Sequence, residues 1–173
     1  MIKLHLGCGN IRINGFINID VRSTDATDKV ADVTTLSEFH DNTVDMIYSA
    51  GVLEHFSHRI TQDVLGEWYR VLKIDGEMII WVPNFDAYIK HYLRGCIFHR
   101  KQSLQNILFY LYGGQQYFEN AHKSIFNGPY LRLLLYEEGF RKIKKITPDY
   151  FPVNDCSKHW GCMGFSSFKV AGI

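Results

Sequence analysis

Hydrophobic and polar residues along the chain form short apolar runs separated by turns, a pattern typical of an α/β protein. A buried strand is predicted at each of five places in the first half: residues 3–6, 16–20, 30–33, 43–50 and 77–82. Between the last two, apolar residues recur at helical spacing over residues 60–72, and Asp75-Gly76 predicts a turn after that helix. This order predicts strands and a helix packed in layers.

The second half completes the same pattern. Pro129 lies where a helix favours proline, Leu131, Leu134 and Leu135 form an apolar face, and Gly139 ends the helix. Strands are then predicted at residues 141–146 and 165–170. Residues 85–126 are an insertion, because a short link would connect Pro83-Asn84 to the Pro129 helix. We expect one domain spanning residues 1–173.

The first strand runs into a glycine loop, and the second strand ends on an acid. Gly7 and Gly9 let the backbone pass close to a ligand, and Asp20 can accept hydrogen bonds from a ribose diol at the carboxyl edge of the sheet. This pairing predicts an adenosine-binding site.

The loop does not fit a dinucleotide. Arg12 stands where the dinucleotide fingerprint needs its third glycine, so an adenine-nucleotide oxidoreductase is disfavoured. Residues 10–15 are also too few for a crossover helix, so no helix N-terminus is predicted to hold a pyrophosphate. S-adenosylmethionine carries no phosphate and therefore fits the loop better.

The ordered motifs resemble those of the class I S-adenosylmethionine-dependent methyltransferases, in particular the small type 11 group. The motifs are Gly7-Cys8-Gly9-Asn10, Phe16 to Asp20, Asp32, Val44-Asp45, Leu53-Glu54-His55, Gly76 and Pro83-Asn84. The resemblance implies a Rossmann-like, doubly wound, mostly parallel sheet in the order 3-2-1-4-5-7-6, with the first crossover helix shortened or absent. It also implies S-adenosylmethionine as cofactor and S-adenosylhomocysteine as product.

We expect cofactor contacts from the glycine loop and from the strand ends. The candidates are Gly7, Cys8, Gly9, Asp20, Val21, Asp32, Val33, Ser49 and Ala50. Asp32 is placed to accept from the adenine amino group while the amide of Val33 donates to the ring. Each acid alone could equally be a solvated loop residue.

Two histidines are candidates for a catalytic base. His55 follows the central strand and His122 lies near the end of the insertion, so both could reach the mouth of the cleft. Either could instead be structural. Glu54 is the alternative base.

The insertion, residues 85–126, is expected to form a lid that binds the methyl acceptor. It is rich in aromatic and basic residues, including Tyr88, Tyr117 and Lys123, which favours a flat or anionic acceptor. Its aromatic residues could also form a core of the lid itself. The acceptor is expected to be a small molecule or a sugar-containing precursor, and the family resemblance implies a bacterial glycan pathway. The alternative function is a catalytically weak subunit that binds S-adenosylmethionine and scaffolds or activates a partner.

Composition predicts a cytoplasmic protein with no nucleic-acid partner and no membrane span. The 173 residues are 46% hydrophobic, carry a net charge of +1 and include four cysteines expected to stay reduced. Cys156, His159 and Cys162 could bind a metal but supply only three ligands, and Asn84 and Asp86 are too few for magnesium, so we expect no metal. The missing crossover helix leaves one sheet face bare, which the insertion or a second subunit in a homodimer is expected to cover.

Overall fold

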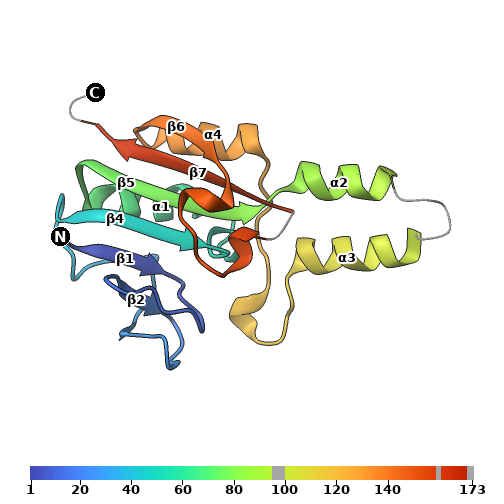
Figure 1. Cartoon of the computed structure of the whole chain (residues 1–173), viewed down its shortest axis with the longest axis horizontal. Coiled ribbons are helices and arrows are strands. Elements are labelled where there is room, and N and C mark those ends of the chain that lie inside the picture. Colours follow the sequence, from blue (N-terminus) through green and yellow to red (C-terminus); the bar gives the residue numbers. More distant parts are fainter. Residues whose placement is uncertain (95–99, 159–160, 171–173) are drawn as a thin grey trace.

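A computed structural model describes residues 1–94, 100–158 and 161–170. Across these residues, seven strands form one sheet in the order β3-β2-β1-β4-β5-β7-β6, which confirms the predicted order (Figure 1). The strands are β1 Lys3–Leu6, β2 Ile17–Asp20, β3 Lys29–Val30, β4 Val44–Ala50, β5 Leu72–Pro83, β6 Phe140–Ile146 and β7 Cys162–Lys169.

The sheet is parallel from β3 to β5 and antiparallel at β7. In β1, Leu4 is paired with Ile17 of β2 on one side and with Ile47 of β4 on the other. β7 runs antiparallel to both β5 and β6. The carboxyl ends of β1, β2 and β4 therefore meet at one edge, where ligands bind in open α/β sheets.

The Asp75-Gly76 turn lies inside a strand instead of between a helix and a strand. β5 already begins at Leu72, directly after helix α1 Thr61–Val71, and Asp75 has a positive φ of 60°. The pairing of β4 with β5 shifts register between Val44 and Met46, so the residues around Asp75 bulge out of the ladder. The turn residues thus extend β5 through an irregularity.

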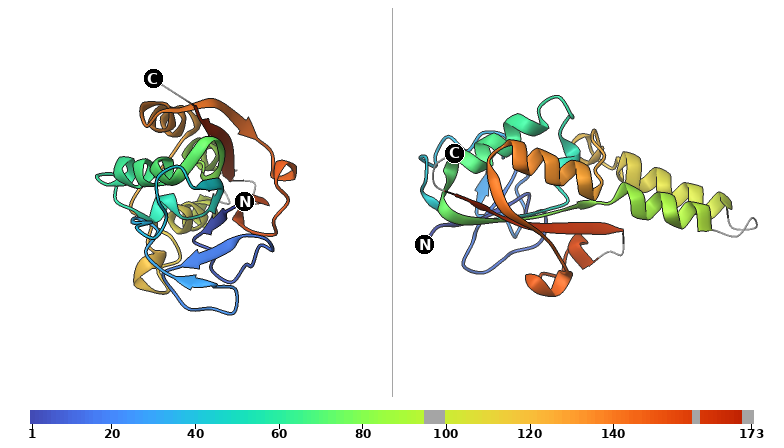
Figure 2. Two further views of the ribbon diagram at one scale, coloured as in Figure 1. Left: turned by 90° about the vertical axis from the view of Figure 1, so that its left-hand side faces the viewer. Right: turned by 90° about the horizontal axis from the view of Figure 1, so that it is seen from above.

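Two helices cover one face of the sheet. α1 and α4, which spans Gly128–Glu137, lie on the same side (Figure 2). Trp68 of α1 is fully buried and donates from Nε1 to the carbonyl oxygen of Val33 at 2.9 Å. Asn127 caps α4 by accepting from the amide of Tyr130 at 3.0 Å, and Pro129 lies in its first turn as predicted. This face holds the larger apolar core.

The link between β1 and β2 contains no helix in the described structure, as predicted. The fully buried side chain of Asn18 organises it. Its Oδ1 accepts from the amide of Ile13 at 2.9 Å and from Nδ1 of His5 at 3.0 Å. Its Nδ2 donates to Asp28 Oδ2 at 2.7 Å and to the carbonyl oxygen of Phe16 at 3.1 Å. One side chain thus replaces a helix as the organiser of this connection.

The second face is covered by loops. Tyr48, Ile79, Trp81 and Val153 form its buried cluster, against which Ile11, Ile13, Phe16 and Phe151 pack. Tyr48 donates to Asp155 Oδ2 at 2.6 Å, which ties the segment after β6 to β4. The expectation that the insertion covers this face is wrong, because the apolar residues of the link and of the segment after β6 do so. Cover by a second subunit stays a prediction.

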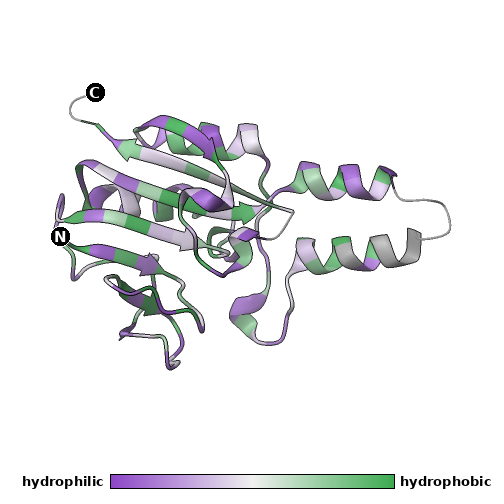
Figure 3. Cartoon of the chain, viewed as in Figure 1, coloured by the Kyte–Doolittle hydropathy of each residue, from purple (hydrophilic) through white to green (hydrophobic). Residues whose placement is uncertain are grey.

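Most of the insertion forms a helical arm. α2 Phe85–Arg94 and α3 Arg100–Tyr112 project away from the sheet (Figure 1 and the right-hand view of Figure 2). Tyr88 stacks on Tyr110 at 4.3 Å between ring centroids. Hydrophobic residues are interspersed along the arm (Figure 3), and Leu93 and Phe109 are 74% and 57% exposed. No helix in the described ranges combines the length and apolar character needed to cross a membrane. The lid role stays a prediction.

Candidate functional site

A cavity of about 510 Å³ opens at the carboxyl ends of β1, β2 and β4. Its size falls within the range of about 300–1,000 Å³ typical of small-molecule sites. It is lined by Gly7, Gly9, Asp20, Val21, Arg22, Ala31, Asp32, Val33, Thr34, Gly51, Val52, His55, Phe56, Ile60, Tyr117, Glu119, Asn120 and Lys123. The structure therefore brings six of the nine predicted cofactor residues to one cavity.

The glycine loop requires glycine for steric and conformational reasons. Gly7 and Gly9 have positive φ values of 69° and 54°. A Cβ at Gly7 would lie 2.2 Å from Cγ2 of Val52, so a side chain there would collide with the wall of the cavity. The close approach of these two segments shapes the floor of the site.

Asp20 is held rigidly beside the glycine loop. It is 6% exposed, and its carboxylate accepts from the amide of Gly9 at 2.7 Å and from the amide of Arg22 at 2.9 Å. A carboxylate has about four acceptor positions, so two backbone donors leave capacity for a ligand hydroxyl. The predicted acid thus keeps acceptor positions for a ribose diol.

The other predicted residues divide into two groups. Asp32, an exposed residue that accepts from the amide of Thr34 at 2.8 Å, lines the cavity together with Val21 and Val33. Cys8, Ser49 and Ala50 do not line it; the thiol of Cys8 instead lies 3.7 Å from Oγ1 of Thr27. The sheet buries Ser49, and Gly51 with Val52 supplies the cavity wall. Cofactor contacts from those three residues stay predictions.

Tyr117 and Lys123, two residues of the expected acceptor-binding insertion, line the cavity, whereas the contribution of Arg22 was not predicted. Tyr117, Glu119, Asn120 and Lys123 line the cavity, and the guanidinium of Arg22 lies 4.5 Å from the ring centroid of Tyr117. Because Arg22 follows Asp20 by two residues, its position near the end of β2 could have been predicted from the sequence. No local pattern indicated that Tyr117 would reach it.

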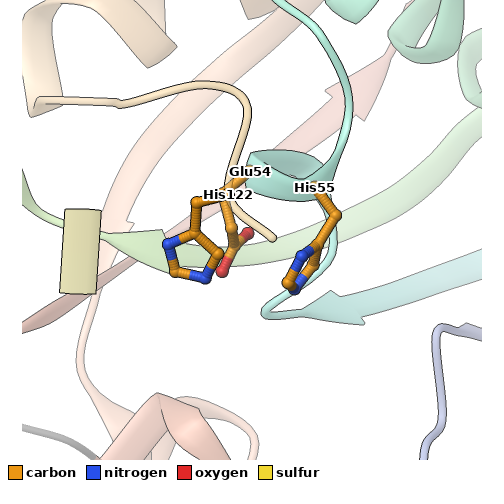
Figure 4. A group of neighbouring side chains, drawn as sticks. All are labelled: Glu54, His55 and His122. Carbon is orange, nitrogen blue, oxygen red and sulfur yellow. The ribbon is translucent and has the colours of Figure 1, made fainter. Parts of the chain in front are cut away.

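Glu54, His55 and His122, the three predicted catalytic residues, lie together. One donor atom from each side chain lies within 4.8 Å of the other two, and Figure 4 shows the Glu54 carboxyl group between the imidazole rings. His55 lines the cavity, whereas Glu54 and His122 do not. The rings of His55 and His122 meet edge to face, with centroids 4.9 Å apart.

Backbone pairing holds this cluster together. The carbonyl oxygen of Glu54 accepts from the amides of Lys123 and Ser124 at 2.8 and 3.1 Å, and Oγ of Ser124 donates to the carbonyl oxygen of Phe56 at 2.6 Å. The end of the insertion is thereby fixed along the short 3-10 helix Leu53–His55. This pairing places His122 beside Glu54.

Burial controls the charges of the cluster. It raises the pKa of Glu54 to about 8, and Oε2 of that residue has no hydrogen-bond partner in the described part of the chain. Burial, followed by the neighbouring His122, lowers the pKa of His55 to about 4. Burial also lowers the pKa of His122. Both imidazoles are therefore neutral near pH 7.

Among the described residues, the group of three possible metal ligands contains Glu54, His55 and His122 but no cysteine. Cys8, Cys156 and Cys162 are free thiols within the described ranges. The adjacent Cys162 thiol, and then burial, raise the pKa of Cys156. His159, which was considered as a metal ligand together with Cys156 and Cys162, lies outside the described residues.

Comparison with protein-family models finds a match over residues 4–80 to a methyltransferase domain. This stretch contains the glycine loop, Asp20, Asp32 and the Glu54-His55 pair, and it ends within β5. The fold is that of the class I S-adenosylmethionine-dependent methyltransferases. The match confirms the predicted resemblance and the predicted cofactor, S-adenosylmethionine.

Solved methyltransferase structures share this fold across nearly the whole chain. A methyltransferase from Thermotoga maritima matches with a TM-score of 0.63 and 13% identity, covering 97% of this chain and 82% of its own. A Burkholderia thailandensis 1,6-didemethyltoxoflavin-N1-methyltransferase with bound S-adenosylhomocysteine matches with a TM-score of 0.62 and 15% identity, and the match covers 98% of this chain and 71% of that one. One chain of a complex between the Haloferax volcanii activator Trm112 and a methyltransferase matches with a TM-score of 0.58 and 14% identity, and the match covers 98% of this chain and 82% of that one. A comparison with curated proteins found no match.

Proposed function

We propose that the protein transfers a methyl group from S-adenosylmethionine to a small-molecule or sugar-containing acceptor. The observation that carries this proposal is the single cavity that joins the glycine loop, Asp20 and Asp32 to His55. Cofactor-binding and candidate catalytic residues thus share one space at the carboxyl edge of a methyltransferase-fold sheet.

The residues present suit this cofactor. Gly7 and Gly9 leave room for close approach, and Asp20 has unused acceptor positions for the ribose hydroxyls. β3 ends at Val30, earlier than the predicted strand, and Asp32 is exposed two residues later, where it could accept from the adenine amino group. When bound, S-adenosylmethionine supplies an electrophilic methyl group. The protein's own task is to hold the acceptor in line with that group and to exclude water.

Within this proposal, Glu54, His55 and His122 form the catalytic group. His55 reaches the cavity directly and is the residue placed to contact an acceptor. Glu54 and His122 lie behind it and act on the acceptor through His55. Replacing His55 or His122 by Gln is expected to leave cofactor affinity nearly intact and to lower turnover about 10²–10⁴-fold, because the effect arises in the transition state.

The end of the insertion forms the acceptor side of the proposed site. Arg22 and Lys123 place two cations at the cavity, and the guanidinium of Arg22 lies beside Asp20, with Nε 3.5 Å from Oδ1. This charge pattern favours an acceptor that carries a carboxylate or phosphate. The arm itself would then set access to the site.

Calorimetric titration with S-adenosylmethionine and S-adenosylhomocysteine tests the cofactor half of the proposal, with NAD⁺ as the comparison ligand. Asp32→Ala should weaken binding, whereas Asp25→Ala, an exposed acid in the preceding loop that does not line the cavity, should not. Transfer of a labelled methyl group to a panel of anionic small molecules and sugar precursors tests the reaction. Binding of NAD⁺ in place of S-adenosylmethionine would contradict the proposal.

A scaffolding or activating subunit is the second candidate. The projecting arm favours it, because Leu93, Phe109 and Tyr112 are 74%, 57% and 55% exposed. A partner that masks these side chains would explain their exposure. Labelled methyl transfer by the isolated protein supports the enzyme, whereas S-adenosylmethionine binding with transfer only by an added partner supports the subunit.

A further inference from the structure

We propose that Glu54, His55 and His122 form a binding site for one divalent first-row transition-metal ion at the wall of the cofactor cavity. Two imidazoles and one carboxylate, each with a donor atom within 4.8 Å of the others, are the ligand types that such ions take in proteins. The residues come from two segments that are 66 or more positions apart in sequence and are joined by backbone hydrogen bonds.

Both histidines are oriented for a metal by backbone carbonyl oxygens. Nδ1 of His122 lies 2.7 Å from the carbonyl oxygen of Tyr110, and Nδ1 of His55 lies 3.2 Å from that of Ala121. A carbonyl oxygen only accepts, so each Nδ1 must carry the hydrogen, and the lone pair of each ring then resides on Nε2. Metal-binding histidines are fixed in this way by a hydrogen bond from their second nitrogen.

Glu54 supplies a second, independent observation. Its side chain is buried, with 3% of the residue exposed, and Oε2 has no hydrogen-bond partner in the described part of the chain. An unpaired buried carboxyl oxygen is unfavourable unless a cation or a donor satisfies it. The neighbouring cation, Lys123, lies over the ring of Phe118 with Nζ 4.9 Å from the centroid. A metal ion would satisfy Oε2.

The donor set selects the class of ion. Imidazole nitrogen with carboxylate suits Zn²⁺, Mn²⁺, Co²⁺ or Fe²⁺, whereas Mg²⁺ and Ca²⁺ prefer oxygen ligands throughout. Ligands bound at about 2.0–2.2 Å to one ion lie closer together than 4.8 Å, so binding must draw the side chains inward. Because backbone hydrogen bonds hold both segments in place, this movement would fall to the side chains.

Three protein ligands leave coordination positions for the acceptor. His55 lines the cavity, so an ion bound to it lies where an acceptor oxygen can also coordinate. Coordination lowers the pKa of a hydroxyl and so favours oxygen nucleophiles. This role rests on the proposed function, whereas the binding of the ion does not.

Metal binding by the full chain, stripped with EDTA, tests the inference without an acceptor. Titration with ZnCl₂ should show one equivalent per chain, and CoCl₂ should give a visible absorption band that Zn²⁺ displaces. Glu54→Gln and His122→Ala should each weaken Zn²⁺ binding by more than about 100-fold, since changes to outer-shell groups alone cost about 10–100-fold. His58→Ala, an exposed histidine of the same loop, should bind as the wild type does.

The adjacent thiols need their own control. Cys156→Ser and Cys162→Ser should leave Zn²⁺ affinity unchanged, and millimolar MgCl₂ should not displace Co²⁺. The inference is overturned if the wild type binds no Zn²⁺, if both site variants retain wild-type affinity, or if a serine variant loses it. Circular dichroism and S-adenosylmethionine titration of every variant report folding. A protein that binds S-adenosylmethionine but not Zn²⁺ contradicts only the metal site. A protein that binds Zn²⁺ but not S-adenosylmethionine contradicts only the proposed function.

Discussion

The carboxylate of Asp20 accepts a hydrogen bond from the amide of Gly9 at 2.7 Å, joining the end of β2 to the glycine loop after β1. Because Asp20 also accepts from the amide of Arg22, it holds together two segments that line the cavity, the glycine loop and the residues that follow β2.

Asp20→Ala is expected to weaken S-adenosylmethionine binding by about 1.5–3 kcal/mol, because charge-assisted bonds to the ribose are lost. Asp32→Ala should have a smaller effect, since the adenine keeps its backbone contacts. Calorimetry measures both, with Asp25→Ala as the matched control. Unchanged affinity in Asp20→Ala would remove that residue from the cofactor site.

Gly7→Ala is expected to lower the free energy of unfolding by about 2–4 kcal/mol. A Cβ there lies 2.2 Å from Val52, and the left-handed backbone adds about 1–2 kcal/mol of strain. Gly15 also has a positive φ, 81°, but nothing lies within 4 Å of its Cβ position, so Gly15→Ala should show the strain alone. Urea unfolding measures the difference. Equal effects in the two variants would show that Val52 moves aside without cost.

Asn18→Ala is expected to destabilise the protein by about 2–4 kcal/mol, because it leaves His5 and the backbone of Ile13 without their buried partners. Asn14→Ala, at an exposed position of the same link, should change stability by less than about 0.5 kcal/mol. Chemical unfolding of both variants gives the comparison. A small effect at Asn18 would mean that the link is organised by its apolar residues alone.

Low pH should destabilise the link between β1 and β2, because it protonates Asp28. Hydrogen bonds from the amide and side chain of Asn18, with Arg12 beside it, lower the pKa of Asp28 to about 2. Since the folded pKa lies below the unfolded value, the stabilisation is present above about pH 4 and is lost as the pH falls toward 2. The difference in unfolding free energy between wild type and Asp28→Asn should therefore shrink over that interval. A difference independent of pH would contradict the assignment.

Tyr117→Leu is expected to weaken S-adenosylmethionine binding about two- to fivefold. The Tyr117 ring supports Arg22, whose Nε lies 3.5 Å from Asp20 Oδ1, and an exposed cation–π contact contributes about 0.5–1 kcal/mol. Tyr112→Leu changes an exposed tyrosine of the arm and serves as the control. Wild-type affinity in both variants would exclude the end of the insertion from cofactor binding.

The sequence by itself determined the positions of most strands, the absent crossover helix, the glycine loop and the acid at the end of β2, whereas the predicted order of the sheet came from the resemblance to a known family. These features depend on burial patterns and backbone preferences within segments of about 20 residues, which local residue types encode. Gly7 and Asp20 are examples: each is fixed by the strand that precedes it, so their meeting at one sheet edge follows from parallel topology.

Only the tertiary structure decided that Glu54, His55 and His122 meet, and which segments cover the second face of the sheet. His122 meets Glu54 because the amides of Lys123 and Ser124 pair with Glu54 after the chain has passed through the arm. Tyr48 likewise meets Asp155 from 107 positions away. Such contacts depend on the path of a long insertion or loop and on the burial it achieves, and no periodicity in the sequence specifies that path.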